Sequence, residues 1–403
     1  MLKTWDIFCK VVDNFGDIGV CWRLAKQLQR EHGLQVRLWV DDLGIAQHLI
    51  PTLALASATQ YHEDICIQNW YEHADFSQAA DVVIEGFACG LPSSYLSAMV
   101  KHQSKWLNLE YLSAESWVDD FHGKPSPQAN GLVRYFYFPG FTEKSGGLIR
   151  ESNMTAQLQS NPDTPFLQQQ EPSLNKNSRR IAATQSSALY LPSCVRFPAL
   201  AGVTENEAFQ SALKISLFCY PNAPISDLFN ALQSNTHAVI VYVPKSAILP
   251  NVTKYFGKEV VEAGEKLTKN NLTVEVLPFL SQADYDALLR MCDLNFVRGE
   301  DSWVRAIWAA KPFVWQPYWQ EENTHLKKLQ AFLDVFYCDA EVQVTDTIQQ
   351  FQQAWAKEYI NAGLLNAYLA QFSPIQQTTL HASQRLVNQV DLASKLVIFC
   401  KKI

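Results

Sequence analysis

The sequence predicts an α/β protein with two doubly wound domains that face each other across a cleft. Over the first 150 residues, short apolar runs that suit buried strands alternate with helical patterns. The same alternation starts again near Leu213, after a stretch that lacks it. Alternating strands and helices form parallel sheets covered by helices, and a chain of 403 residues suffices for two or three domains.

The first half opens as strand, loop and helix. Residues 5–12 are aromatic and β-branched, as in a buried strand, and the turn-rich segment 13–19 follows them. Apolar residues then recur every four positions, which predicts a helix from residue 20 to 31 that ends near Gly33. Three further strands are expected in this half, at 36–40, 81–85 and 105–111.

The segment 152–190 differs in composition from the sequence on both sides of it. It is rich in glutamine, serine and asparagine, which favours a polar, mobile insertion or an excursion between domains. A dedicated binding segment is the alternative, although no charge pattern or amphipathic stripe supports it. We therefore expect an N-terminal domain over 1–195, a C-terminal domain over 210–375, and a helical segment over 376–403 that packs back across the domains.

The second half repeats the alternation with its own elements. Strands are expected at 215–220, 238–243, 272–277, 294–297 and 312–315. Helices are expected at 226–234, 285–292 and 303–310. In doubly wound folds the ligand binds at the carboxyl ends of the strands, so the loops after these strands are the candidate sites.

Composition excludes several classes of protein. The net charge of −7 argues against a broad nucleic-acid surface, because phosphate binding needs excess lysine and arginine. No apolar run reaches the roughly 20 residues of a membrane span, and charged residues interrupt the N-terminal apolar stretch where a signal peptide would lie. The nine cysteines are scattered without metal-ligand spacing, which is typical of a reducing cytoplasm. We expect a cytoplasmic protein with no metal, nucleic-acid or membrane partner.

The loop after the first strand carries two carboxylates. Asp13 and Asp17 lie four residues apart, and Gly16 and Gly19 allow the backbone to approach a ligand. The glycine spacing fits neither a dinucleotide-binding motif nor a P-loop. One interpretation makes the aspartates a turn residue and a helix N-cap. As a pair at the expected cleft, they also suit a general base or a cation site.

The loop 298–302 follows a strand and precedes a helix. Gly299 permits close approach of a ligand, and the free N–H groups at the helix N-terminus form an anion site suited to a diphosphate. Asp301 or Ser302 is expected to cap the helix. An ordinary capped turn is the alternative interpretation, but it gives no reason for Arg298 and Glu300 beside it.

Aromatic residues follow two strands of the second half. Tyr220 and Phe279 could sandwich a nucleobase, although core packing is the default role of any single ring. Gln282 could bond the edge of a pyrimidine, or it could equally start a helix. Because these residues and the loop 298–302 all lie in the second half, we expect that half to hold the nucleotide ligand by itself.

Several blocks of the chain together resemble the bacterial protein-arginine rhamnosyltransferases that modify elongation factor P, the EarP family. The blocks span most of the chain, at 7–20, 106–115, 140–151, 297–302, 310–313, 322–323 and 325–326. The resemblance implies a GT-B glycosyltransferase fold and inverting transfer of L-rhamnose from dTDP-β-L-rhamnose to one arginine of elongation factor P, which activates the factor. Helix N–H groups can stabilise the leaving diphosphate without a metal, so we expect no metal cofactor.

The resemblance also implies roles for residues. The essential carboxylates correspond to Asp13, Asp17 and Glu300. The family's donor contacts correspond to Asn14, Phe15, Gly16, Asp17, Tyr220, Gln282, Gly299, Glu300, Asp301 and Ser302. The residue patterns above add Phe279 and Arg298 to the candidate donor-binding set. This chain departs from the family pattern in the length of segment 152–190 and at 218–222, which leaves open whether Phe218 or Tyr220 stacks on the base.

The expected chemistry agrees with the residues. A guanidinium is a poor nucleophile because its pKa lies above about 12, so carboxylates beside it must orient it and accept its proton. Two other functions remain open. One is a GT-B nucleotide-sugar transferase with a small-molecule acceptor, and the other is a non-enzymatic module that binds nucleotides or proteins. Transfer of a sugar to an arginine would separate them, whereas binding of dTDP alone would not.

Overall fold

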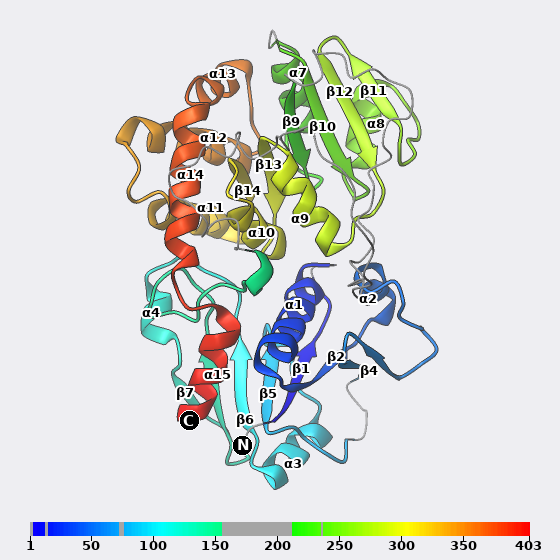
Figure 1. Cartoon of the computed structure of the whole chain (residues 1–403), viewed down its shortest axis with the longest axis vertical. Helices are drawn as coiled ribbons and strands as arrows, with labels where there is room; N and C mark the ends of the chain where they lie inside the picture. The colour runs from blue at the N-terminus through cyan, green and yellow to red at the C-terminus, as the bar shows by residue number, and fades with distance from the viewer. Residues whose placement is uncertain (1–2, 13–14, 72–75, 155–211, 235–236) are drawn as a thin grey trace, which may run out of the picture.

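The computed structural model describes residues 3–12, 15–71, 76–154, 212–234 and 237–403. Two α/β halves are stacked along the long axis of the molecule (Figure 1). The expected domain boundaries at 195 and 210 lie outside the described residues, as does the segment 155–190 of the expected insertion.

The N-terminal half is built on an eight-stranded sheet in the order β3-β4-β2-β1-β5-β6-β8-β7. Its strands are β1 (Thr4–Cys9), β2 (Gln35–Val40), β3 (Thr59–His62), β4 (Ile65–Asn69), β5 (Val82–Gly86), β6 (Lys105–Leu109), β7 (Pro125–Pro127) and β8 (Val133–Tyr137). All pairings are parallel except those of the edge strands β3 and β7. The helices of this half are α1 (Phe15–His32), α2 (Leu43–Leu49), α3 (Ser93–His102) and α4 (Trp117–Phe121).

The C-terminal half contains a six-stranded sheet in the order β11-β12-β10-β9-β13-β14. Its strands are β9 (Leu213–Leu217), β10 (Val239–Pro244), β11 (Lys266–Lys269), β12 (Leu272–Leu277), β13 (Leu294–Arg298) and β14 (Phe313–Gln316). Only β11 pairs antiparallel among the described strands of this sheet. Its helices are α7 (Ile225–Gln233), α8 (Leu249–Phe256), α9 (Gln282–Met291), α10 (Asp301–Ala309), α11 (Thr324–Phe336), α12 (Val342–Ala356) and α13 (Ala362–Ala370).

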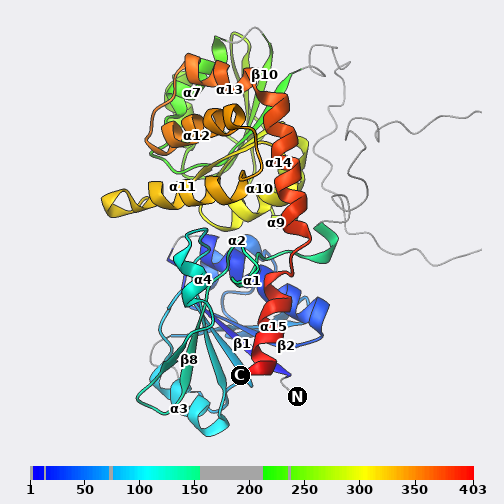
Figure 2. The same ribbon diagram turned by 90° about the vertical axis from the view of Figure 1, so that its left-hand side faces the viewer.

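The last two helices run back along both halves. Helix α14 (Phe372–Val387) contacts α10 and α12, and α15 (Leu392–Lys402) contacts α1 (Figures 1 and 2). Lys105 holds α15 against the N-terminal half: its Nζ donates to the backbone oxygens of Cys400 at 2.7 Å and Ile403 at 2.9 Å. The C-terminal segment therefore bridges the two halves on one side of the molecule.

The expected α/β class with two parallel-rich sheets is confirmed, but the predicted start of the first helix, at residue 20, is wrong. The helix begins at Phe15, so the prediction of a turn through residue 19 is wrong. Gly16 and Gly19 indicated a turn because glycine is a poor helix former. Tertiary packing overrides that preference, since the first turns of α1 pack against the other half, where Asp301 lies at ordinary van der Waals distance, 3.5 Å, from the position of a Cβ on Gly19. The first strand also ends at Cys9 rather than at residue 12.

Three edge strands were not predicted from the sequence. β3 reads Thr-Gln-Tyr-His and β11 reads Lys-Leu-Thr-Lys, so both lack a buried apolar run, and β7 has only three residues. Short, polar edge strands give no clear alternation of buried and exposed side chains. Within the described part of the chain, no helix is long and apolar enough to cross a membrane.

Candidate active site

Two adjoining cavities lie between the two halves, at the carboxyl ends of the sheets. The first has an empty volume of about 730 Å³ and is lined mainly by residues that follow β9, β10, β12 and β13. The second has an empty volume of about 950 Å³ and draws on both halves. Gly16, Gly299 and Glu300 line both cavities, so the two meet between the start of α1 and the loop after β13.

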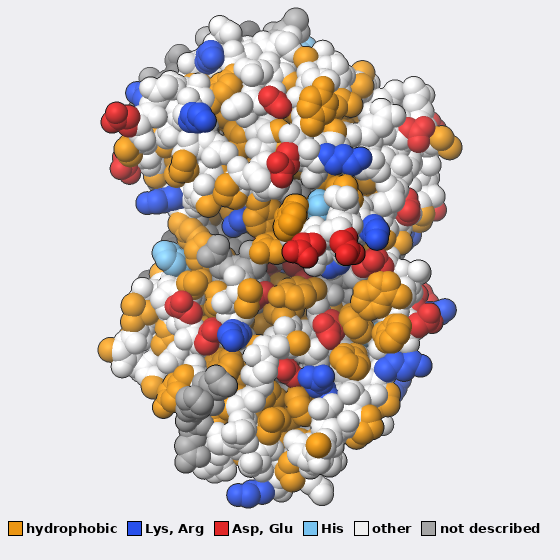
Figure 3. All heavy atoms as spheres, turned by 180° about the vertical axis from the view of Figure 1, so that it is seen from behind, with side chains coloured by type: hydrophobic (Ala, Val, Ile, Leu, Met, Phe, Trp, Pro, Cys, Tyr) orange, Lys and Arg blue, Asp and Glu red, His pale blue; other side chains and the backbone are white. Residues whose placement is uncertain are grey.

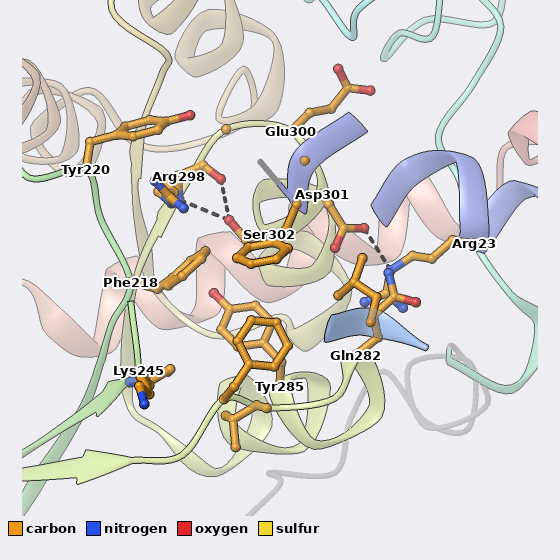
Figure 4. A pocket seen from close by; sticks show the side chains of 17 residues that line it. Arg23, Phe218, Tyr220, Lys245, Gln282, Tyr285, Arg298, Glu300, Asp301 and Ser302 are labelled. Atoms are coloured by element: carbon orange, nitrogen blue, oxygen red, sulfur yellow. Dashed lines mark hydrogen bonds and ion pairs between the residues drawn. The ribbon is translucent and has the colours of Figure 1, made fainter. Parts of the chain in front are cut away.

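A cation held between two aromatic rings forms one wall of the first cavity. The Arg298 guanidinium lies 4.7 Å from the ring centre of Phe218 and 4.6 Å from that of Tyr220 (Figure 4). Arginine over an aromatic face is stabilised by the electrostatic attraction of the ring. Lys245, at the end of β10, also lines this cavity. The wall therefore combines flat apolar faces with positive charge.

The loop after β13 presents the N-terminus of α10 to the first cavity. Gly299 has a φ of 59°, a left-handed conformation that glycine adopts without strain. Ser302 Oγ accepts from the Arg298 N–H at 3.0 Å and donates to the Arg298 carbonyl, while Asp301 pairs with Arg23 at 2.7 Å. The prediction that Asp301 or Ser302 caps the helix is therefore wrong, because both lie inside it with their side chains engaged elsewhere. Glu300 holds the N-cap position without capping.

Glu300 stands at the junction of the two cavities. Its Oε2 accepts the N–H of Leu112, in the N-terminal half, at 2.9 Å. Removal from bulk water raises the pKa of this carboxyl to about 8; the Leu112 N–H opposes the rise, and the negative charges of Asp17 and Asp301 add to it. A carboxyl with this pKa holds a proton at neutral pH until a cation binds beside it.

Asp17 lines the second cavity from the first turn of α1. Its side chain is buried, with Oδ2 accepting from the Val12 N–H at 2.9 Å and Oδ1 from the Tyr111 hydroxyl at 3.4 Å. Asp17 is therefore not the N-cap that one interpretation suggested, but the third residue of the helix. Its carboxylate is fixed by neighbours rather than free to rotate.

A strained aromatic turn forms the adjacent wall of the second cavity. Phe87 and Ala88 have φ values of 56° and 52°, which cost energy in residues other than glycine. The Phe87 ring stacks on Tyr111, with centroids 4.5 Å apart and planes 16° from parallel. Buried Asn108 holds the turn by accepting the Ala88 N–H at 3.0 Å. The turn thus stacks the Phe87 ring on Tyr111, whose hydroxyl donates to the Asp17 carboxylate.

All described residues of the predicted site line these two cavities. The first is lined by Phe15, Gly16, Tyr220, Phe279, Gln282, Arg298, Gly299, Glu300, Asp301 and Ser302 (Figure 4). Asp17 lines the second, while Asp13 and Asn14 lie outside the described residues. Because Phe15, Gly16 and Arg23 contribute, the C-terminal half does not line the first cavity alone, contrary to expectation.

Three side chains that were predicted to contact the ligand already contact other residues of the protein. Gln282 starts α9, and its amide accepts from Lys26 Nζ and donates to the Gly19 carbonyl, both at 3.2 Å. Phe279 packs edge-on against Phe15 at 5.0 Å, whereas Tyr220 has Arg298 over its ring. The two rings thus lie in different aromatic groups of the same cavity, and their roles toward a base stay predictions.

Sequence reasoning missed several residues that line the cavities. These are Arg23, Lys245 and Tyr285 in the first cavity and Phe87, Tyr111 and Lys328 in the second. Lys245 and Tyr111 fall at or just after expected strand ends, where the rule for doubly wound folds could have indicated them. Arg23 lies within α1 and reaches the site only because that helix packs against the other half. Among the described residues, no group of three or more His, Cys, Asp or Glu could hold a metal ion.

Two Rossmann-like sheets with a site at their facing carboxyl ends define the GT-B class of glycosyltransferases, and this chain has that fold. The solved structure of the spinosyn rhamnosyltransferase SpnG aligns with this chain over 98% of this chain and 99% of SpnG. The TM-score is 0.50 and the sequence identity 10%, so this similarity supports the fold alone.

The family follows from comparisons at higher identity. The family model described as "Elongation-Factor P (EF-P) rhamnosyltransferase EarP" matches residues 5–401. The protein-arginine rhamnosyltransferases of Pseudomonas putida and Pseudomonas aeruginosa are 40% and 38% identical, with 99% of each chain covered. A solved structure that explains EarP-mediated arginine glycosylation of elongation factor EF-P has a TM-score of 0.63 and 30% identity, with 99% of each chain covered. This chain belongs to the EarP family and is a protein-arginine rhamnosyltransferase.

Proposed function

We propose that this enzyme transfers L-rhamnose, with inversion, from dTDP-β-L-rhamnose to one arginine of elongation factor P and thereby activates the factor. The observation that carries the proposal is the meeting of two cavities at Glu300. One cavity suits a nucleoside diphosphate, and the other sets a buried carboxylate beside aromatic rings. Because the proposed acceptor is a translation factor, we expect the reaction to take place in the cytoplasm.

The first cavity suits the nucleotide of the donor. The N–H groups at the start of α10 and the positive charges of Arg298 and Lys245 suit a diphosphate. Because Arg298 already covers one face of Phe218 and one face of Tyr220, a base that stacks on either ring must use the other face or displace the guanidinium. Phe279 and Phe15 offer further apolar surface in the same cavity.

The second cavity suits the acceptor arginine. A guanidinium placed between Asp17 and Glu300 would find a fixed carboxylate on one side and a carboxyl that ionises as the cation binds on the other. Asp17 then orients the attacking nitrogen and accepts its proton, while the sugar is attacked from the face opposite the departing diphosphate. Phe87 stacks on one face of Tyr111, so a guanidinium that packs on this ring would use the opposite face.

The surface around the second cavity suits a protein acceptor. On the face of the molecule drawn in Figure 3, hydrophobic and acidic side chains gather at the waist between the two halves. Tyr318, 59% exposed, and Tyr111, 46% exposed, line the cavity. Exposed aromatic residues are common anchors in protein interfaces, and acidic side chains favour a basic partner.

The direct test is the intact mass of elongation factor P after incubation with this enzyme and dTDP-rhamnose. The mass should increase by one deoxyhexose. Release of dTDP without a change in the mass of the factor would mean that the rhamnose passes to water, and would contradict the proposed acceptor. Failure to consume the donor at all would favour a non-enzymatic module.

The ring residues of the first cavity give a prediction about donor affinity. Tyr220→Ala and Phe279→Ala should each weaken dTDP binding about tenfold, within the roughly 1–3 kcal/mol of a stacked base. Tyr359→Ala, which removes an exposed ring outside both cavities, is the matched control. Calorimetry that finds unchanged affinity in both cavity variants would assign these rings to packing.

Removal of divalent metal ions should not affect the reaction. The α10 N-terminus, Arg298 and Lys245 already supply positive charge for the leaving diphosphate, so we expect no metal cofactor. Turnover measured after dialysis against EDTA should equal that of the untreated enzyme. Loss of turnover that added Mg²⁺ restores would contradict this expectation.

A further inference from the structure

Arg23 joins the two halves of the molecule at the wall of the first cavity. It projects from α1 and is only 2% exposed. Its Nε donates to Asp301 Oδ1 at 2.7 Å (Figure 4), and its terminal nitrogens lie 3.4 Å from carboxylate oxygens of Asp286 and Glu151. The short contact is therefore the one to Asp301, the first residue of α10.

Arg305 completes this buried network but serves a different part of it. It binds Asp286 through two nitrogens at 2.8 and 2.7 Å and Glu151 at 2.6 Å. Burial raises the pKa of Glu151, but the positive charges of Arg305 and Arg23 outweigh this and hold it at about 2. Burial lowers the pKa of Arg305, but the charges of Asp286 and Glu151, and after them that of Asp301, raise it. Within the described residues, however, no hydrogen bond joins Arg305 to Asp301, and Arg305 does not line the first cavity. The two arginines thus share two acids, but among the described residues only Arg23 forms a hydrogen bond with Asp301.

The negative charge of Asp301 lies where it would affect the binding of a diphosphate. Its carboxylate lines the cavity at the N-terminus where the diphosphate is proposed to bind. An unpaired carboxylate there would repel a diphosphate and could occupy the same N–H groups. Pairing with Arg23 cancels that charge and turns Oδ1 toward α1.

We propose that Arg23 is a positioning residue for the donor: by pairing with Asp301, it keeps the N-terminus of α10 open to the donor diphosphate. The inference rests on the proposed function, because it assumes that a nucleoside diphosphate binds in the first cavity. It makes donor binding depend on a residue of the N-terminal half, so the two halves must be packed together before the donor site is complete.

The test is a double-mutant cycle with dTDP as the ligand, read by calorimetry. Arg23→Gln should weaken dTDP binding about tenfold, because Asp301 loses its counter-charge. In an Asp301→Asn background the same Arg23→Gln change should alter affinity by less than about twofold. Arg23→Lys, which retains the positive charge, should recover most of the affinity. If the loss is equal in both backgrounds, Arg23 acts independently of Asp301 and the proposal is overturned.

Arg305→Gln is the matched control for a merely structural role. It removes three short hydrogen bonds from the same network and should lower the melting temperature at least as much as Arg23→Gln does. Its dTDP affinity should nevertheless stay within about twofold of the wild type, because Asp301 keeps the short hydrogen bond from Arg23. An equal loss of affinity in both variants would mean that the network acts only through the fold, which overturns the proposal.

Failure of the proposal differs from failure of the proposed function. If the wild-type enzyme does not bind dTDP, both are wrong. If the wild type binds dTDP and Arg23→Gln binds it equally well, only the role of Arg23 is wrong. Should Arg23→Gln not yield folded protein, the comparison of Arg23→Lys with Arg23→Met decides, since charge pairing predicts tighter dTDP binding for the lysine variant and packing alone does not.

Discussion

Replacing Asp17 with asparagine should lower turnover by roughly 10²–10⁴-fold, the usual contribution of a general base, with dTDP affinity unchanged. The amide oxygen can still accept the Val12 N–H that now bonds Oδ2 at 2.9 Å, so the start of α1 should keep its shape. What is lost is the charge that holds the acceptor guanidinium and the site that accepts its proton. Single-turnover rates at saturating donor, together with calorimetry for dTDP, measure the two effects.

Asp64→Asn is the matched control for this prediction. Asp64 is exposed in a left-handed turn between β3 and β4, a conformation that asparagine also tolerates. Its removal should change neither rate nor affinity. Near-normal turnover in Asp17→Asn would remove Asp17 from the catalytic set. Asp13→Asn should behave like Asp17→Asn, although Asp13 lies outside the described residues.

Replacing Glu300 with glutamine should lower kcat by at least about 100-fold and weaken dTDP binding far less. The carboxyl is not needed as a helix cap, since Glu300 makes no side-chain capping bond. Its hydrogen bond from the Leu112 N–H, at 2.9 Å, can be kept by the glutamine oxygen. The variant therefore removes mainly the ability to ionise beside the acceptor cation, which matters when donor and acceptor are both bound.

The raised pKa of Glu300 gives this variant a distinctive dependence of stability on pH. The folded carboxyl has a pKa of about 8, above its ordinary value, so the folded state binds its proton more tightly than the unfolded state does. Wild-type stability should then fall as the pH rises from the ordinary glutamate range through 8. Glutamine cannot ionise, so Glu300→Gln should match the wild-type melting temperature at pH 5 and exceed it at pH 9.

Exposed Glu259 provides the control, because Glu259→Gln should alter neither stability nor rate. A structural account of Glu300 makes the opposite prediction. It expects a lower melting temperature at every pH, with activity lost only in proportion to the unfolded protein. A destabilised Glu300→Gln enzyme with a normal rate per folded molecule would exclude Glu300 from catalysis.

Site residues that directly follow apolar strands were predictable from the sequence. Site residues that reach the cavities only through tertiary packing were not. Glu300 comes directly after the buried strand β13 and its glycine, so local pattern alone pointed to it. Asp17 was also found, although for a partly wrong reason, because it lies in a helix rather than a loop. In both cases the carboxyl ends of parallel strands determined the location.

The missed residues carry no local signal for physical reasons. Phe87 reaches the second cavity through a left-handed backbone that nothing in its side chain favours, and it is held there by Asn108 and its neighbours. Arg23 looks like an ordinary charged residue of an amphipathic helix. Its burial depends on acids that are 128 to 278 positions away in the sequence. Pairings of that length follow from how the two halves pack, which single-sequence patterns do not encode.

The most direct test of the central claim is an NMR spectrum of elongation factor P treated with this enzyme and dTDP-β-L-rhamnose. The account predicts one rhamnose, attached through a guanidino nitrogen of an arginine, with the α configuration that inversion requires. A β-linked sugar, or a sugar attached to any residue other than arginine, would contradict the account.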